Sequence, residues 1–328
     1  MGLILGCTKR FIAFAFLVLA ASSVTAQQFP QKTIRIIVGY PPGGGSDLIA
    51  RVVGEQLSLK LATPVIVENV PGAGSSISVA TAAKAPADGY TILLATSSFT
   101  INPNLYKKVN YDPIKDFDPI ARIGDSPFYI VAQASSPINT VQELITQAKA
   151  KPGALRYSSG GNGSVGHLVG EVFKSMAGVD IQHIPYKGLT AGIAGLLGGQ
   201  VDITMSDLAS ALSTLKAGRI KMLGVTTKQR VARLPNVPTI AESGVPGYEV
   251  VLWYGLMVPA DTPKPVENLL HTTLRDIVTT PEKKVLDRYD ALGIVPPEYS
   301  TQEAFSAFIK HDLAFWAKAV KNSGATTD

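Results

Sequence analysis

Residues 33–51, TIRIIVGYPPGGGSDLIAR, give the clearest indication of the fold, because they combine an apolar strand, a glycine loop and a helix start. The β-branched and apolar residues 33–38 are typical of a buried parallel strand. Two prolines end that strand, and the three glycines after them reach backbone conformations closed to other residues. We expect Ser46 or Asp47 to cap a helix that begins near Leu48.

A glycine-lined helix start at the carboxyl end of a strand is a natural site for an anion. Free N–H groups and the helix dipole converge at such a point. The loop is not a Walker loop, since no Gly-Lys-Ser/Thr follows its glycines. It can hold a carboxylate without supplying a catalyst, which is the first indication of a binding protein.

A second glycine loop, SGGNGS, occupies residues 159–164. Residues 161–166 match the G-x-G-x-x-G dinucleotide pattern, and Asp180 lies close to the spacing of the acid that binds ribose. Asp180 starts the next expected strand, however, whereas a dinucleotide site needs this acid at the end of the strand. We therefore favour a second anion-binding helix start, with Ser164 near the cap and His167 one turn further, and keep NAD as the alternative.

The N-terminus predicts export. Two basic residues precede an apolar run at 11–21, which is too short to span a bilayer comfortably. Val-Thr-Ala at 24–26 fits the small-x-small rule of signal peptidase, so we expect a signal peptide at 1–26 that is cleaved after Ala26. An uncleaved membrane anchor is the alternative.

Cysteine usage limits the chemistry of the mature chain. The only cysteine, Cys7, lies before the apolar run, whereas the cysteine of a lipoprotein box would follow it, so we expect no lipid anchor. The mature chain then has neither disulfides, thiol catalysis nor cysteine metal sites. Its core alone must stabilise it in an oxidising compartment, and a chain of this length can do so as two domains.

The charge pattern gives no indication of a nucleic-acid partner. The formal net charge of +5 falls to about +3 without the leader, and the basic residues are scattered. A nucleic-acid-binding surface needs a basic run or an aromatic-interleaved basic patch, and neither occurs. No segment after the leader is long and apolar enough to cross a membrane.

Strand-like and helix-like segments alternate along the chain, which predicts an α/β architecture. Further strands are expected at 65–67, 91–95, 128–132, 155–158, 181–184, 222–225 and 253–258, and helices after the capping box Thr140-x-x-Glu143 and at 190–197, 265–278 and 301–320. The order strand, glycine loop, helix occurs in two parts of the chain, which suggests two similar lobes.

Catalytic and metal-binding motifs are missing from the sequence. No serine lies in G-x-S-x-G, and no histidine lies in H-E-x-x-H. His167 and Glu171 are four residues apart and could share a metal, although such pairs more often form a hydrogen bond. We expect His183 to be a structural histidine in an apolar strand, and Trp253 and Tyr254 to pack in the core or between the lobes. The sequence therefore predicts neither an enzyme, a metal site nor a cofactor.

The ordered set of short motifs along the mature chain resembles the Bug family, the extracytoplasmic substrate-binding proteins of tripartite tricarboxylate transporters. The motifs are GYPPGGGSD at 39–47, VEN at 67–69, PGAG at 71–74, PADGYT at 86–91, YDP at 111–113, YSSG at 157–160, PYKG at 185–188, LLGGQVD at 196–202, VPT at 237–239 and PGY at 246–248. Each motif is short, but their order and spacing together are specific.

The resemblance implies a type II periplasmic binding fold, in which two α/β lobes are joined by crossing strands and close on a ligand in a central cleft. We expect the first lobe at 27–125, the second lobe at 126–225, and a return to the first lobe with C-terminal helices at 226–328. The implied ligand is a small carboxylate: a dicarboxylate, a citrate-like acid, an acidic amino acid or an aromatic acid.

The same resemblance implies which residues contact the ligand. In the first lobe they are Tyr40, Pro42, Gly43, Gly44, Ser46, Asp47, Ser97 and Ser98, and in the second they are Ser159, Gly160, Asn162, Gly163, Ser164, His167, Tyr186 and Asp207. Two positions depart from the family pattern. Tyr40 replaces a common phenylalanine, and the acid at Asp207 is shifted by one residue, which would turn it to the opposite face of a strand.

The expected function is capture of the carboxylate by lobe closure in the periplasm and its delivery to membrane permease subunits. We expect a monomer without a nucleic-acid partner. Two alternatives stay open: a ligand-sensing accessory to a two-component receptor, and an exported enzyme.

Cleavage after Ala26 predicts a mature protein of 302 residues that begins at Gln27. Expression of the full chain with export, followed by N-terminal sequencing and intact-mass measurement of the periplasmic product, should give this start. A product that keeps residues 1–26 and sediments with membranes would support the anchor instead.

Overall fold

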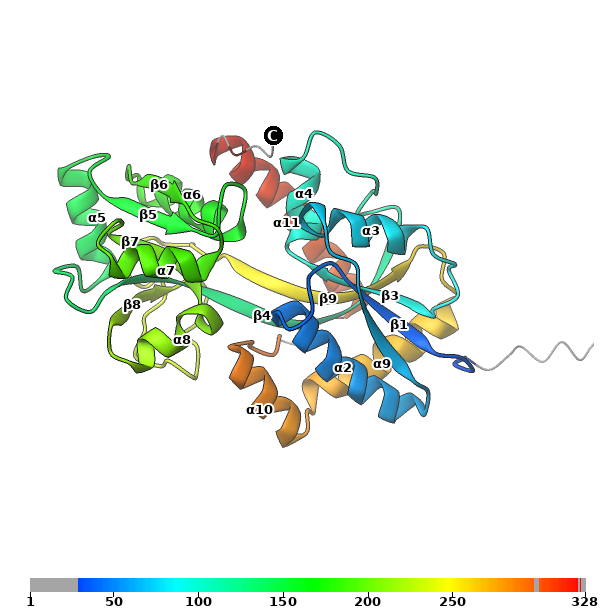
Figure 1. Ribbon diagram of the computed structural model, residues 1–328. Helices are drawn as coiled ribbons and strands as arrows, with labels where there is room; N and C mark the ends of the chain where they lie inside the picture. Colours follow the sequence, from blue (N-terminus) through cyan, green and yellow to red (C-terminus); the bar gives the residue numbers. More distant parts are fainter. Residues whose placement is uncertain (1–28, 298–300, 324, 326–328) are drawn as a thin grey trace, which may run out of the picture.

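The computed structural model describes residues 29–297, 301–323 and 325, and it has the α/β architecture that the sequence predicts (Figure 1). The expected signal peptide at 1–26 and its cleavage site lie outside the described residues. Among the helices of the described chain, none is long and apolar enough to span a bilayer.

Two α/β lobes lie side by side in Figure 1. The strands are β1 (Ile34–Val38), β2 (Val65–Asn69), β3 (Thr91–Thr96), β4 (Phe117–Gln133), β5 (Arg156–Ser159), β6 (Gln182–Pro185), β7 (Ile203–Asp207), β8 (Ile220–Val225) and β9 (Val251–Pro259). The helices are α2 (Gly45–Leu61), η1 (Ala73–Ser75), α3 (Ser76–Ala83), α4 (Ser98–Leu105), α5 (Val141–Ala150), α6 (Val165–Ala177), α7 (Leu189–Leu197), α8 (Leu208–Lys216), α9 (Lys264–Thr279), α10 (Lys283–Leu292) and α11 (Gln302–Ser323).

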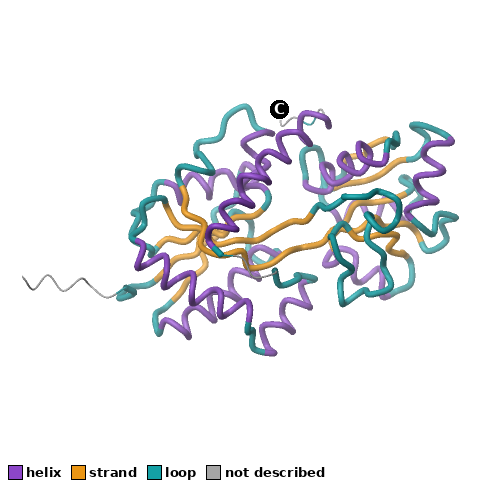
Figure 2. The backbone as a smooth tube through the Cα atoms, turned by 180° about the vertical axis from the view of Figure 1, so that it is seen from behind, coloured by secondary structure: helices purple, strands orange, loops and turns teal. Residues whose placement is uncertain are grey.

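The long strand β4 belongs to both lobes. The strand order is β2-β1-β3-β9-β4-β7-β5-β6, and β8 also pairs with β4. As far as Pro127, β4 pairs with β9 in the first lobe, and from Phe128 it pairs with β7 and β8 in the second. Figure 2 shows β4 and β9 running between the lobes from behind. The crossing strands of the predicted fold are therefore confirmed.

Alternate residues of these strands fill cores on both faces of the sheet. In β3, Ile92 and Leu94 join one apolar cluster, whereas Leu93 and Ala95 join another. The second-lobe part of β4 alternates in the same way, because Ile130 and Tyr129 belong to different clusters. This period of two is the strand pattern, with helices covering both faces.

Residues 226–250 pack on the second lobe, although the sequence analysis assigned 226–328 to the return into the first. Thr239 bridges to Val225 at the end of β8, and Ile240, Tyr248 and Val250 are buried in the second-lobe core. The chain therefore returns to the first lobe along β9 itself. The expected boundary between 125 and 126 falls inside β4.

Local signals account for most elements. Glu143 N–H donates to Thr140 Oγ1 at 3.1 Å, so Thr140 caps α5 as predicted. The Glu143 side chain reaches back one residue further than a capping box requires, and its Oε2 accepts the Asn139 N–H at 2.7 Å. The sequence analysis missed α3, α4, α8 and α10. All four helices are short, and the apolar periodicity of α3 and α4 is weak, with Pro103 inside α4.

The C-terminal helix α11 packs against both lobes, since it contacts α4 in the first lobe and α6 in the second. Its buried Asp312 accepts hydrogen bonds from Thr100 Oγ1 at 2.6 Å and from Trp253 Nε1 at 2.8 Å. One carboxylate therefore ties α11 to α4 and to the crossing strand β9. Trp253 is fully buried there, as the sequence analysis expected.

Replacement of this carboxylate should reveal its contribution to stability. Asp312→Ala leaves the buried Trp253 Nε1–H without an acceptor, whereas the Thr100 hydroxyl can still donate to the Ser97 carbonyl at 2.9 Å. The variant should therefore lose about 1–3 kcal/mol of unfolding free energy. Asp312→Asn keeps one acceptor oxygen and should cost clearly less. Urea denaturation of both variants measures the difference, and equal losses would contradict the role of the acceptor.

Candidate functional site

The first glycine loop connects β1 to α2 at the carboxyl edge of the first-lobe sheet. The helix begins at Gly45 with Gly44 as its N-cap, so the prediction that Ser46 or Asp47 caps a helix near Leu48 is wrong. The physical reason is that Asp47 lies inside the first turn and reaches back, accepting the Gly43 N–H at 2.9 Å. Gly43 has φ +84°, which a side chain would strain.

Asp47 anchors this loop through a buried ionic cluster. Its carboxylate is 2 % exposed and accepts bonds from Arg51 Nε at 3.0 Å, Arg51 Nη2 at 2.9 Å and Asn69 Nδ2 at 2.9 Å. Asn69 Nδ2 also donates to the Tyr40 carbonyl at 2.9 Å. The hydrogen bonds from Arg51 above all hold the pKa of Asp47 at about 2, below its usual value. The carboxylate therefore shapes the loop and is ionised at neutral pH.

Hydroxyl groups surround this loop on the side of β3. The Tyr40 hydroxyl lies 2.7 Å from Ser98 Oγ and 3.1 Å from Thr96 Oγ1. Ser97 is fully buried, and its Oγ accepts the Trp253 backbone N–H at 3.1 Å, so its side chain has a structural partner. Tyr40 and Ser98 are partly accessible and can turn a hydroxyl toward a ligand.

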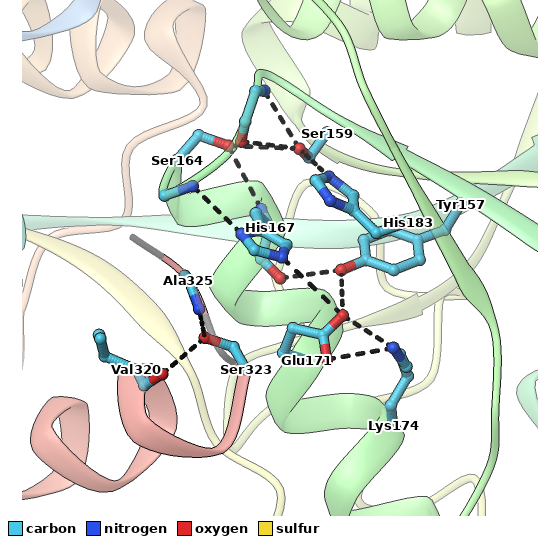
Figure 3. A network of polar contacts seen from close by, with 12 residues as sticks. Tyr157, Ser159, Ser164, His167, Glu171, Lys174, His183, Val320, Ser323 and Ala325 are labelled. Carbon is cyan, nitrogen blue, oxygen red and sulfur yellow. Dashed lines mark hydrogen bonds and ion pairs between the residues drawn. The ribbon is translucent and has the colours of Figure 1, made fainter. Parts of the chain in front are cut away.

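The second glycine loop connects β5 to α6 in the other lobe (Figure 3). Ser164 is the N-cap of α6, as predicted, and its Oγ accepts the His167 N–H at 3.3 Å. Gly163 N–H donates to His167 Nδ1 at 3.1 Å, and Gly161 N–H donates to Ser159 Oγ at 3.1 Å. The two loops are thus alike: in each, the third helical residue accepts the N–H of the glycine before the cap.

Two stacked imidazoles lie beneath this second loop. The His167 and His183 ring centroids are 4.0 Å apart with an interplanar angle of 14°, and His183 Nε2 lies 2.7 Å from Ser159 Oγ (Figure 3). Burial lowers the pKa of both histidines, that of His183 to about 3. Both rings are therefore neutral near pH 7, and His167 carries its proton on Nε2 because Nδ1 accepts the Gly163 N–H.

A buried polar chain continues below the histidines. The Tyr157 hydroxyl donates to Glu171 Oε1 at 2.7 Å, and Lys174 Nζ donates to the same oxygen at 2.9 Å. His167 Nε2 is 4.0 Å from this oxygen, so the neutral ring lies beside the Lys174–Glu171 ion pair without being an ionic partner. Within the described ranges, no group of three or more His, Cys, Asp or Glu side chains could hold a metal.

The remaining second-lobe candidates lie at neighbouring strand ends. The Tyr186 hydroxyl donates to Gln200 Oε1 at 2.8 Å. Asp207 is the N-cap of α8 and its Oδ1 accepts the Ser210 N–H at 2.7 Å. Gly160 accepts the Gly188 N–H through its carbonyl at 3.2 Å, and Asn162 is exposed.

The sheet topology explains why the candidate site residues of each lobe lie close together. β1 runs parallel to β3, and β5 runs parallel to β6 and β7, so their carboxyl ends share an edge in each lobe. Asp180 precedes β6, at the opposite end from the acid of a dinucleotide site.

Sequence reasoning missed several groups at these edges. Arg51, Asn69 and Thr96 support the first loop, and Tyr157 supports the second. His183 was expected to be a structural histidine, and its bond to Ser159 agrees with that expectation. Tyr254 was assigned to packing, yet its hydroxyl lies beside the start of α2. The only sequence feature that could have indicated this location is that Tyr254 directly follows the buried Trp253 in a crossing strand.

Comparisons with known proteins agree with this geometry. The profile of a family described as "Tripartite tricarboxylate transporter family receptor" matches residues 49–324. Protein BugT of Bordetella pertussis is 33 % identical over 307 residues, which cover 93 % of each chain.

Two solved structures carry bound carboxylates. R. palustris Rpa4515 with adipate has a TM-score of 0.77 and 32 % identity, covering 91 % of this chain and 99 % of the other. MatC from Rhodopseudomonas palustris with bound malate has a TM-score of 0.71 and 25 % identity, covering 89 % and 100 %.

The lowered pKa of Asp47 predicts pH-dependent stability. Its folded-state pKa of about 2 lies below the usual 3.8, so its contribution is present above pH 4 and is lost as the pH falls toward 2. Asp47→Asn should lower the unfolding free energy by about 1–2 kcal/mol at pH 7. This figure allows for solvent screening, because Arg51 is half exposed. The loss should become smaller as the pH falls from 4 to 2.

Denaturation at several pH values measures this difference. Glu68→Gln is the control, because its ion pair with Arg35 is exposed on both sides and contributes at most about 1 kcal/mol. A pH-independent loss in Asp47→Asn would show that shape, and not charge, makes the contribution.

Proposed function

The chain belongs to the tripartite tricarboxylate transporter receptor family, and from this premise we propose that it captures one small carboxylate between its lobes for a membrane permease. It is a periplasmic solute-binding protein of this family and not an enzyme. The identity of the ligand, the residues that contact it and the partnership with a permease are what we propose.

One observation carries the proposal: each lobe presents a glycine loop and a helix start at the carboxyl edge of its sheet, and crossing strands join the lobes. The first-turn N–H groups of α2 and α6 have no partners within their own helices. Such groups and the helix dipole favour a carboxylate. The adipate and malate in the related structures support this ligand class.

The hydrogen bonds separate the residues that hold the loops in shape from the groups that we assign to the ligand. Asp47, Ser97, Ser159 and His167 are buried and already bonded, so we assign them to holding the loops in shape. The backbone of the loops and the hydroxyls of Tyr40, Ser98 and Ser164 are the groups we assign to the ligand. Pro42, Gly43, Gly44, Gly160, Asn162 and Gly163 shape or supply that backbone, and Tyr186 and Asp207 lie at the rim.

Capture then proceeds by closure. One lobe binds the carboxylate, β4 and β9 flex, and the second lobe adds its donors while water is excluded from charge-assisted bonds. The closed form presents a surface to the permease. We further propose that the protein works as a monomer.

A screen of the purified chain 27–328, stripped of ligand, tests the ligand class. L-malate, adipate, citrate, L-aspartate and benzoate are compared with NAD and sucrose in a thermal-shift assay. A carboxylate at a hundredfold its Kd should raise the unfolding free energy by about 2.7 kcal/mol. A response to NAD alone, or to nothing, would contradict the proposal.

A matched pair of variants locates the response. Ser164→Ala should reduce the ligand-induced shift, whereas Ser135→Ala, in the exposed turn after β4, should not. The shift is compared with each variant's own baseline, because loss of the cap itself costs about 1 kcal/mol.

Uptake of the labelled carboxylate separates transport from sensing. A strain that lacks this protein should lose uptake if it serves a permease. Unchanged uptake with a lost transcriptional response would favour the sensory accessory.

A further inference from the structure

Helix α10 and the segment that follows it are fixed to the first lobe. The Glu55 carboxylate of α2 accepts a hydrogen bond from Arg288 Nη1 at 2.6 Å. The buried Tyr289 hydroxyl donates to a backbone carbonyl of β4 at 2.8 Å. Beyond the helix, Val295 and Asp125 of β4 exchange two backbone hydrogen bonds of 2.8 Å. The end of α10 therefore moves with the first lobe.

This part of the first lobe contacts the second lobe at two points outside the crossing strands, where α8 and α10 face each other (Figure 1). Asp290 Oδ2 lies 2.9 Å from Nη1 of Arg233, which belongs to the segment 226–250 on the second lobe. A methyl group placed on Gly293, the C-cap of α10, would lie 3.0 Å from the Cβ of Leu208. Since Leu208 is the first residue of α8, the end of α10 packs directly against the start of α8.

The ion pair between the lobes is not tied to one geometry. Arg233 Nη1 is buried and has no hydrogen-bond partner among the described residues, although Asp290 lies within ion-pair distance. The attraction is therefore ionic and not directional, so it persists over a range of lobe orientations. The Asp290 side chain is 62 % exposed, and screening by water keeps the attraction weak. Such a pair biases the position of the lobes without locking it.

The four residues of these two contacts line a cavity of about 230 Å³. Its apolar walls come from both lobes, with Val231 on the second and Leu286 and Ile294 on the first. Protein interiors are close-packed, so the walls of a lobe core cannot move past one another freely. A cavity between the lobes leaves room for such movement, and the joint can adjust as the lobes rotate.

We propose that the Arg233–Asp290 pair and the Leu208–Gly293 contact form an inter-lobe clasp, which narrows the range of lobe orientations in the free protein. Two crossing strands can bend and twist, and a third attachment beside them restricts both movements. Arg233 acts on the orientation of the second lobe as a whole and is therefore a positioning residue. The proposal goes beyond the proposed function, because it concerns the protein without ligand.

The range of lobe orientations can be measured directly. The chain 27–328 has no cysteine, so two spin labels can be attached at chosen sites. Lys60→Cys at the end of α2 and Lys149→Cys in α5 place one exposed label on each lobe. Double electron–electron resonance then gives the distribution of inter-label distances. All variants are compared in this labelled background and without ligand.

Loss of the ion pair should loosen the clasp. Arg233→Gln should broaden the distribution and raise the population outside the range of the unaltered clasp about two- to fivefold. Arg230→Gln is the control, because Arg230 pairs with Glu242 at 3.0 Å within the second lobe, and it should change nothing. Asp290→Asn should reproduce the broadening. The double variant Arg233→Gln/Asp290→Asn should broaden the distribution no further than either single change.

The apolar contact has its own matched pair of variants. Gly293 and Gly178 are both C-cap glycines in the left-handed region, with φ +67° and +62°. A methyl group on Gly178 meets no atom within 4 Å, whereas one on Gly293 meets Leu208 across the lobes. Gly293→Ala should therefore broaden the distribution and Gly178→Ala should not, although both carry similar backbone strain.

Each comparison can overturn its part of the proposal. An unchanged distribution in Arg233→Gln, equal broadening in Arg230→Gln, or additive effects in the double variant would overturn the role of the ion pair. Equal distributions in Gly293→Ala and Gly178→Ala would overturn the role of the apolar contact. Because the measurement uses no ligand, its result does not depend on whether a carboxylate binds.

Discussion

The ladder of hydrogen bonds between β4 and β9 is the constraint on which the molecule depends. β4 pairs with β9 in the first lobe and with β7 and β8 in the second, so one continuous strand fixes the sheets relative to each other. Both glycine loops lie at the carboxyl edges of these sheets. Any motion that brings the loops together must therefore bend these two strands while the lobes stay intact.

Each loop is preorganised by its own side chains. Asp47 and His167 occupy equivalent places, three residues after their caps, and each accepts a glycine N–H. One lobe uses an ionised carboxylate neutralised by Arg51, and the other uses a neutral imidazole stacked on His183. At the binding site that we propose, a ligand would meet loops whose shape is already fixed, which reduces the ordering cost of binding.

Much of this could be predicted from local sequence. The apolar run before the first loop, the Thr140 cap and the Ser164 cap rest on interactions within a few residues, and all are confirmed. The first part of β4 could not be recognised, because Asp118, Pro119 and Pro127 interrupt its apolar pattern and only pairing with β9 makes it a strand. The packing of residues 226–250 on the second lobe depends on contacts between distant segments, which the apolar periodicity of a sequence does not reveal.

The place of β9 in the sheet order also sets the sequence of assembly. All the strands that only the second lobe uses, and the end of β4 with which they pair, are present once residue 225 has been made. The first lobe has β1, β2 and β3 much earlier, but the strand that joins β3 to β4 is β9, which follows the whole second lobe in the chain. Non-local pairing of this kind forms late. The sheet of the first lobe therefore cannot be completed before β9 is present, and until then its apolar strand β3 has an unpaired edge.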